Sequence, residues 1–348
     1  MATSTALNNI GNELLSTTMH ILMKEWRDNV SEATAFLDAH ERVHGAGGPT
    51  QAGGTRIVIP LGMGEHSKTT RMQTGFERID LSVEDVFEPA VFNWGHVVRP
   101  VAISSEEEMI NSGESAIISI LESRVKMTAN ALKRQFCQQI VQGSVTGWDD
   151  WETLNGIDNT TGFLEHRADG AQTNDIGAVD KISFQDKTGW QHGFFDGAAS
   201  FNANGLAGLY DLKVEIASKG GNQPNVILAS REGFKNLKRS LSAQERYVSQ
   251  DKIDGGRLIE YWDGIQIDVE RFMPNVAGAA SATDPASFMF LNLDDIHMLW
   301  DPKGYFDMSD FETVSGEYDV RSAKIRCRGQ LICRSLAGAG LAIDLETF

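Results

Sequence analysis

Apolar side chains recur at helical spacing through one unusually long stretch of the chain, residues 104–143. They follow one another at steps of four, four, seven, four and four: Ile117, Leu121, Val125, Leu132, Phe136 and Ile140. These steps place all of them on one face of a helix, and the residues between them are mostly polar. The spacing therefore predicts one amphipathic helix of about 40 residues, or roughly 60 Å at ~1.5 Å per residue.

Both ends of this helix carry signals. Ser105 and Glu108 have the spacing of a capping box, and the acidic run around them is favoured by the positive end of the helix dipole. Gly143 supplies a C-terminal stop. Gly113 costs roughly 1 kcal/mol inside a helix, so an alternative start lies at residue 112 or 115, with the acidic run as a separate turn.

The chain on either side alternates short apolar strands with glycine-rich turns. Before the long helix, residues 4–44 have helical spacing, and a flexible glycine-rich linker follows them. Residues 56–78 place a polar tip between the apolar run RIVIPLG and the return TGFER. This pattern predicts a projecting hairpin with an edge strand that is open to pairing with another subunit. Further strands are predicted at 79–86 and 97–104.

After the long helix comes a loop-rich stretch of more than 30 residues, and loops of that length are usually functional or held by a partner. A β/α block follows, with helices and strands predicted at 203–219, 226–229, 231–242 and 258–269. The last predicted strands are 288–291, 296–300, 311–314, 323–333 and 341–345. One long helix set among many strands indicates a mixed α+β architecture.

The amino-acid composition limits the class of protein to which the chain can belong. The chain has 348 residues, and 41% of them are hydrophobic, as in ordinary globular protein. No apolar run is long enough to span a membrane and no secretory signal begins the chain, so we expect a protein that stays in the cytoplasm where it is made. The three cysteines lack metal-site spacing and are expected to be reduced core residues: Cys137, Cys327 and Cys333.

The formal net charge of −17 argues against tight binding to nucleic acid, because displacing counterions from phosphates needs a basic face. Partners are therefore expected to be proteins. Basic residues nevertheless cluster along one predicted strand near the C-terminus: Arg321, Lys324, Arg326, Arg328 and Arg334. The favoured interpretation is a solvated strand face or a set of inter-subunit salt-bridge partners.

One catalytic motif is present. His40, Glu41 and His44 satisfy the HExxH pattern, in which two histidines on one helical face hold zinc and the glutamate acts as base toward a zinc-bound water. Glycines end the predicted helix directly after the second histidine, whereas a catalytic zinc helix normally lies in a packed core. Coincidence is therefore the favoured interpretation. We predict no enzyme, no catalytic residues and no cofactor, since no Walker loop or GxSxG motif occurs either.

The order of parts resembles that of a tailed-bacteriophage major capsid protein over essentially the whole chain. Several phrases are also similar to that family: EEEMINSGESAIISILESRV, NVILASREGFKNL, YWDGIQIDVERFMP, FMFLNLDDIHMLWDP and RSAKIRCRGQLICRS. The resemblance implies an N-terminal arm, an extended hairpin loop, a peripheral domain with a spine helix at about 105–142, an axial domain, and C-terminal strands that return to the peripheral domain. The corresponding boundaries are 1–50, 51–78, 79–145, 146–308 and 309–348.

The resemblance also implies a function, which is assembly as pentamers and hexamers into an icosahedral shell around the double-stranded DNA genome of a tailed phage. Assembly would take place in the host cytoplasm with a scaffolding protein and a portal. Decoration proteins are further partners, DNA contact is weak and non-specific, and no membrane is involved. Inter-subunit contacts are expected from the arm, the hairpin and the basic strand: Leu14, Trp26, Arg56, Ile57, Lys68, Arg71, Arg326 and Arg328.

In some members of the family a hairpin lysine is cross-linked to an asparagine of a neighbouring subunit, and Lys68 is the lysine of this hairpin. No partner asparagine can be identified, so a solvated lysine is the favoured interpretation. Two other functions stay open. An encapsulin-like nanocompartment shell has the same fold and encloses protein cargo, and a zinc metallohydrolase would act through His40, Glu41 and His44.

Overall fold

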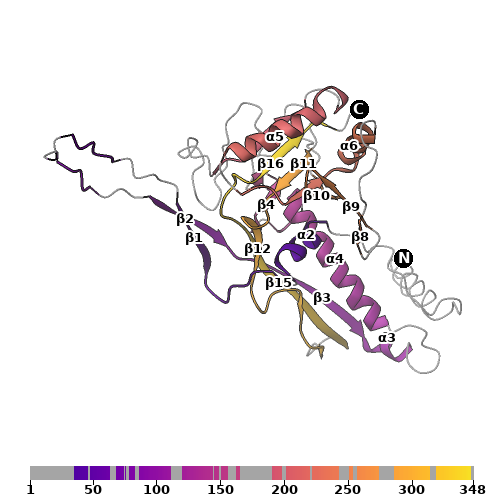
Figure 1. Cartoon of the computed structure of the whole chain (residues 1–348). Coiled ribbons are helices and arrows are strands. Elements are labelled where there is room, and N and C mark those ends of the chain that lie inside the picture. Colours follow the sequence, from indigo (N-terminus) through magenta and orange to yellow (C-terminus); the bar gives the residue numbers. More distant parts are fainter. Residues whose placement is uncertain are drawn as a thin grey trace.

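Two β-sheets and one long helix make up most of the described molecule (Figure 1). The computed structural model describes residues 35–45, 48–62, 68–73, 75, 78–82, 86–110, 120–143, 145–148, 150–155, 162–164, 190–197, 201–219, 222–242, 251–253, 257–273, 286–313 and 319–345. Most of the predicted arm, with Leu14 and Trp26, lies outside these residues, as does most of the loop after the long helix. The mixed α+β class is confirmed.

The larger sheet has seven strands in the order β6-β16-β11-β7-β10-β9-β8. In that order the strands are Gly193–Asp196, Gly340–Ile343, Ala286–Leu291, Val226–Ala229, Ile265–Val269, Arg257–Trp262 and Asp251–Ile253. Helix α5 (Leu206–Ser218), which follows the π-helical turn η3 (Phe201–Gly205), and helix α6 (Arg231–Ser242) pack on one face of this sheet. Their buried leucines and isoleucine meet apolar side chains of the central strands, which fixes both helices on the sheet.

The predicted helix 231–242 and strand 226–229 are confirmed. Ser230 caps α6, because its hydroxyl oxygen accepts a hydrogen bond of 3.0 Å from the N–H of Gly233. The single strand predicted at 258–269 was wrong, since the chain reverses there between β9 and β10. Asp263 and Gly264 make the turn with φ of 48° and 81°, the left-handed conformation that a two-residue hairpin turn requires.

The second sheet has five strands, built around the long strand β15 (Val320–Cys333). Strand β3 (Gly95–Ser104) pairs with β15 along its whole length. Three short strands pair with the other edge of β15: β12 (Ile296–Trp300), β13 (Asp307–Met308) and β14 (Glu312–Thr313). Residues of β15 alternate between buried and exposed along its first half, so one face of the sheet packs inward and the other faces solvent.

The predicted long helix appears as two helices, α3 (Ser105–Ile110) and α4 (Ile120–Gln142), and residues 111–119 between them lie outside the described chain. The capping box is formed one residue earlier than predicted. The N–H of Glu107 donates to the Ser104 hydroxyl, and the N–H of Ser104 donates to the Glu107 carboxylate, both over 3.2 Å. The predicted stop is confirmed, because Gly143 has a φ of 71° and its N–H donates to the Gln139 carbonyl.

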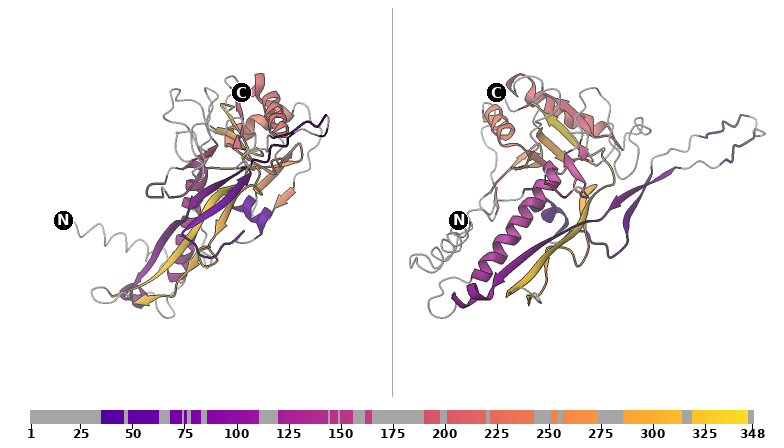
Figure 2. Two further views of the ribbon diagram at one scale, coloured as in Figure 1. Left: turned by 90° about the vertical axis from the view of Figure 1, so that its left-hand side faces the viewer. Right: turned by 180° about the vertical axis from the view of Figure 1, so that it is seen from behind.

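A two-stranded hairpin leads away from both sheets (Figures 1 and 2). Strand β1 (Arg56–Gly62) pairs residue for residue with β2 (Phe87–Asn93). The partner of β1 is therefore β2 and not the predicted TGFER, whose described residues Gly75 and Arg78 are in no strand. The described residues of the predicted strand 79–86, which are 79–82 and 86, are in no strand either. The hairpin is accordingly longer than the predicted segment 51–78, and the described residues between β1 and β2, which are 68–73, 75, 78–82 and 86, are called here the extension.

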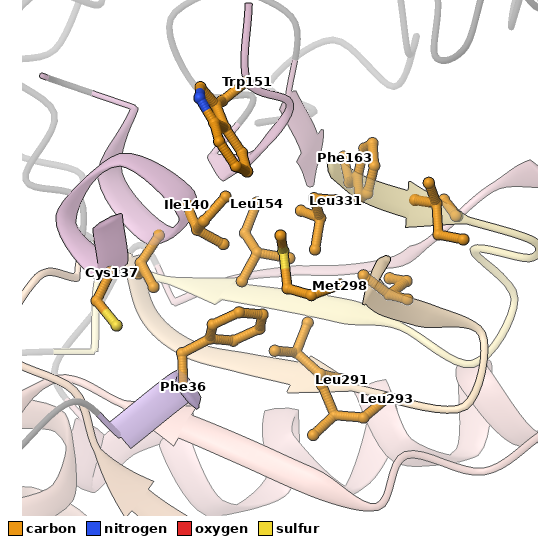
Figure 3. Close-up of a cluster of buried hydrophobic side chains, with 14 of the residues drawn as sticks. Phe36, Cys137, Ile140, Trp151, Leu154, Phe163, Leu291, Leu293, Met298 and Leu331 are labelled. Atoms are coloured by element: carbon orange, nitrogen blue, oxygen red, sulfur yellow. The ribbon is translucent and has the colours of Figure 1, made fainter. Parts of the chain in front are cut away.

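The main core lies where both sheets, α4 and a short helix α2 (Ala35–His44) meet (Figure 3). Phe36 of α2 points toward Ile140 of α4 and toward side chains of both sheets, including Leu291 and Met298. A small parallel sheet, β4 (Thr153–Asn155) with β5 (Gly162–Leu164), covers the C-terminal end of α4. One continuous apolar cluster thus ties the two sheets to the helices.

The strand pairing divides the C-terminal segment between the two sheets. The predicted strands near 311–314, 323–333 and 341–345 are present with shifted ends, but β15 belongs to the five-stranded sheet and β16 to the seven-stranded one. The described part of the predicted unit 309–348 therefore does not pack as a whole beside the long helix.

The three cysteines are buried and in no disulfide, as predicted. Within the described residues, no helix is long and apolar enough to span a membrane.

We predict that Phe136→Ala lowers the free energy of unfolding by about 3–5 kcal/mol. Phe136 is fully buried, and its ring lies 5.2 Å from the rings of both Trp151 and Trp300, centroid to centroid. The substitution leaves a cavity in this aromatic cluster. Urea unfolding of the unassembled subunit measures the change. Met127→Ala, at an exposed position of the same helix, is the matched control and should change stability by less than about 0.5 kcal/mol.

Candidate assembly surfaces and the histidine cluster

The HExxH residues lie on α2, at the place where both sheets meet. His40 is buried, and its Nε2 accepts a hydrogen bond of 3.1 Å from the backbone N–H of Met298 on β12. The Nε2–H of His44 donates to the carbonyl of Leu293 over 2.7 Å. The Glu41 carboxylate accepts a hydrogen bond from the Tyr305 hydroxyl. Each side chain of the motif therefore has a structural partner in the fold.

Those partners bear on the zinc hypothesis. An HExxH zinc site needs a nitrogen of each histidine turned toward one metal, with the glutamate facing the same point. Here His40 and His44 direct Nε2 to different backbone groups, and Glu41 is turned to Tyr305. Among the residues that the structure describes, no group of three metal-ligating side chains is arranged to hold an ion. The side chains of the motif therefore attach α2 to the rest of the fold.

A third histidine extends this group. The ring of His297 on β12 lies 5.3 Å from that of His44, which in turn lies 4.8 Å from that of His40, centroid to centroid. Burial, then the neighbouring His44 and His297, lowers the pKa of His40 from 6.5 to about 3. Burial, then Arg334 and His44, lowers the pKa of His297 from 6.5 to about 4. Both side chains are therefore neutral at pH 7.

Helix α2 is also bound to the seven-stranded sheet. The Arg42 guanidinium forms an ion pair with the buried carboxylate of Asp268 on β10. The N–H of Phe36 donates to the buried carboxylate of Glu270 over 3.1 Å, directly after the same strand. Since His40 binds the other sheet, this one helix holds a polar contact with each of the two sheets.

The hairpin presents the second group of predicted site residues. Arg56, at the start of β1, and Arg71, in the extension, are exposed. Ile57 is buried against its own subunit, with 2% of its surface exposed, so it is unable to contact a neighbour while the subunit is intact. Lys68 donates to the Ser82 hydroxyl and pairs with Asp80 over 3.5 Å. Lys68 therefore links the outgoing and returning halves of its own extension.

The basic row on β15 is the third group. Lys324, Arg326 and Arg328 alternate with buried residues and share the outward face of the five-stranded sheet. The predicted alternation is confirmed for these three residues, whereas Arg321 is out of step with them on β15 and Arg334 lies just beyond the end of the strand. Arg328 already has partners within the chain, because it pairs with Asp301 over 2.9 Å and lies 5.1 Å from the centroid of the Trp94 ring. Arg326 is exposed opposite Val98 of β3 and Asp307 of β13.

Sequence reasoning missed an exposed apolar surface on the hairpin. Large apolar side chains stand in solvent at Val58, Met72, Ile79, Leu81 and Phe87, with 57%, 50%, 53%, 85% and 71% of their surface exposed. The alternation of β1 could have indicated which of its residues face outward. The partner strand β2 was not predicted, so the exposed apolar residues of β1 and of β2 could not be placed on one surface.

We predict that His40→Ala lowers the free energy of unfolding by about 1–3 kcal/mol, because the buried N–H of Met298 loses its acceptor. Chemical unfolding with and without a chelator measures this. His40→Gln, which keeps an acceptor, should retain more of the stability, and the chelator should change neither variant. Stoichiometric zinc in the purified protein, lost together with stability on chelation, would instead support the metallohydrolase.

A second prediction concerns pH. Since the pKa values of His40 and His297 are lower in the folded state than the usual 6.5, the unfolded chain binds more protons below that pH. Their contribution to stability is fully present above pH 6.5 and is lost as the pH falls through 4 toward 3. Urea midpoints between pH 7 and pH 4 should decline less steeply for His297→Gln than for the unmodified chain. His96→Gln, at an exposed position on β3, should leave the slope unchanged.

Comparison with solved structures finds a similar fold in several capsid proteins and in an encapsulin. The structure is similar to the cyanophage A-1(L) capsid protein, with 14% identity, 96% of this chain and 99% of that chain covered, and a TM-score of 0.65. It is similar to the capsid protein of an empty GTA particle, with 12% identity, 99% and 100% coverage and a TM-score of 0.57. It is also similar to the SrpI encapsulin of Synechococcus elongatus PCC 7942, with 9% identity, 94% and 93% coverage and a TM-score of 0.57.

No protein-family model matches the sequence, and no curated protein matches it. At 9–14% identity the shared property is the three-dimensional fold. The matches cover nearly the whole of both chains, so the likeness includes the two sheets, the long helix and the hairpin together. None of the three matched structures is named as an enzyme. The chain has the fold shared by phage capsid and encapsulin shell subunits.

Proposed function

We propose that this chain is the major capsid protein of a tailed phage, which assembles as pentamers and hexamers into an icosahedral shell around double-stranded DNA. The observation that carries the proposal is the full-length likeness to capsid subunits, with 96% of this chain and 99% of the cyanophage A-1(L) chain covered. A partial match would fit a domain reused in another context. The coverage instead supports a subunit made for the same kind of assembly.

The exposed hairpin gives a physical reason for assembly. A monomer in water gains nothing by exposing five large apolar side chains on one projecting segment, and contiguous exposed apolar surface usually marks a protein interface. The hairpin leads away from both sheets (Figure 2), so its own subunit offers little surface to cover it. A neighbouring subunit supplies that cover. In this proposal Arg56, Lys68 and Arg71 lie beside the contact.

Other parts of the proposal follow the same reasoning. The predicted arm 1–50, which includes Leu14 and Trp26, is proposed to bind a neighbour, and its helix α2 is attached to its own subunit through His40. Arg326 lies on an exposed sheet face and is available to a neighbouring acidic surface, whereas Arg328 beside it is already paired with Asp301. A scaffolding protein and a portal act during assembly in the host cytoplasm, decoration proteins bind the finished shell, and the shell contacts DNA weakly.

An encapsulin-like nanocompartment is the second candidate, and the likeness to the Synechococcus elongatus encapsulin favours it specifically. The two candidates differ in what the shell encloses. Particles purified from the native source would contain nuclease-protected DNA in one case and a protein cargo in the other. The net charge of −17 suits a DNA container, since an acidic lining would not hold phosphates tightly during packaging and release.

We predict that deleting residues 64–70 blocks shell formation and leaves a folded subunit. The deletion shortens the extension beyond β1 and β2 and leaves both strands in place. Electron microscopy of the particulate fraction, after expression with and without a candidate scaffolding protein, measures shell formation, and circular dichroism measures folding. Lys235→Ala, at an exposed lysine of α6, is the control and should still form shells. Normal shells from the deletion would refute the role given to the hairpin.

A further inference from the structure

Helix α6 carries a charge opposite in sign to that of the whole chain. The chain has a formal net charge of −17, whereas the sequence of this helix, REGFKNLKRSLS, contains four basic residues and a single acidic one, Glu232. The basic residues are Arg231, Lys235, Lys238 and Arg239. A local reversal of sign on one helix indicates a surface that attracts an anionic partner.

Three of these basic residues form a line along the helix, called here the α6 basic stripe. Arg231, Lys235 and Arg239 follow one another at steps of four residues, which places them on one side of the helix at successive turns. All three are exposed, whereas Leu237 is buried against the seven-stranded sheet. At ~1.5 Å of rise per residue, the stripe is about 12 Å long with roughly 6 Å between neighbouring residues.

The acidic groups beside the stripe leave it basic. Glu232 pairs with Lys235 over 2.9 Å, but these side chains are 44% and 59% exposed. Water and salt therefore screen this pair, and an incoming anion can replace the carboxylate. Glu260 of β9 is paired with Lys238, which lies next to the stripe and not in it. The stripe thus keeps its positive charge on the side that faces solvent.

The spacing of the stripe suits the phosphates of a nucleic-acid duplex. Each strand of a duplex presents one phosphate about every 3.4 Å along the axis, so a line of about 12 Å covers roughly three to four phosphates. The aromatic residue of α6, Phe234, is half-buried and lies 5.1 Å from the Lys238 ammonium, ring centroid to nitrogen. The helix therefore offers no exposed ring on which the bases of a single strand would stack.

We propose that the α6 basic stripe is a contact site for duplex DNA, in which Arg231, Lys235 and Arg239 bind backbone phosphates without reading the base sequence. This inference rests on the proposed shell function, and it names the element through which the subunit contacts the DNA that the shell encloses. The contact is weak and sensitive to salt, because the acidic remainder of the subunit repels phosphates. Shell formation does not depend on the stripe, since the contact is made with DNA and not between subunits.

The test measures the binding of a short labelled DNA duplex to full-length, unassembled subunits by fluorescence anisotropy, over a range of salt concentrations. Replacing the three stripe residues together, by Arg231→Gln, Lys235→Gln and Arg239→Gln, should lower the slope of log affinity against log salt concentration by about 2–3. Affinity at low salt should fall roughly tenfold or more. Each of the three substitutions alone should lower the slope by about 1, so the result does not depend on the folding of the triple variant.

The matched control removes the same amount of charge elsewhere. Lys126→Gln, Lys303→Gln and Lys324→Gln together change three exposed lysines on α4, after β12 and on β15. This triple variant should keep the salt slope of the unmodified chain. An equal loss of slope in both triple variants would show a general effect of net charge and would overturn the assignment to α6.

The remaining results separate this site from the proposed function. Unmodified chains that form no shells under the electron microscope would overturn the proposed function. Shells from the unmodified chain, without any binding of the duplex at low salt, would overturn the stripe alone. Poly-glutamate that displaces the stripe from the duplex at equal charge concentration would show that the stripe accepts an acidic protein surface equally well, which would overturn the assignment of DNA as its partner.

Discussion

Two buried carboxylates set the position of helix α2, and the relation of the two sheets depends on that helix. Asp268 and Glu270 are 2% and 1% exposed, so each carboxylate needs partners within the protein. Gln266 and the N–H of Phe272 donate to them from the side of the sheet, and Arg42 and the N–H of Phe36 add partners from α2. On its other side the helix reaches the second sheet through His40. Removing the Arg42 guanidinium while α2 stays docked would leave the Asp268 carboxylate buried without its ion-pair partner, which is far more costly than losing a surface ion pair.

This arrangement explains why an HExxH pattern can stand in a chain whose relatives in fold are shell subunits. The i, i+4 spacing puts both imidazoles on one helical face, which is a requirement of a zinc site and equally of a helix that must bind a sheet through that face. In this chain the face is turned to backbone groups of Leu293 and Met298. The HExxH pattern therefore does place both imidazoles on one helical face, and their hydrogen-bond partners show that this face holds α2 to the fold.

Periodicity predicted the elements with strong local signals. The helix over 231–242, the buried strand 226–229 and the end of α4 at Gly143 all follow from apolar spacing or from a cap. The strand predictions that failed around the hairpin share one physical cause. Strand β1 pairs with β2 across 24 intervening residues, and no local pattern indicates which of several apolar runs is the partner. The turn at Asp263 and Gly264 did carry a local signal, the Asp-Gly pair, and it was overlooked.

The candidate site residues likewise divide into those that a local pattern placed correctly and those whose position depends on tertiary contacts. Alternation along β15 correctly placed Lys324, Arg326 and Arg328 on an outward face. Whether an outward residue is available to a neighbour depends on tertiary contacts, which is why Arg328 turned out to be paired within the chain and Ile57 to be buried in it. The apolar surface of the hairpin required the register of two distant strands, and pattern alone does not supply a register.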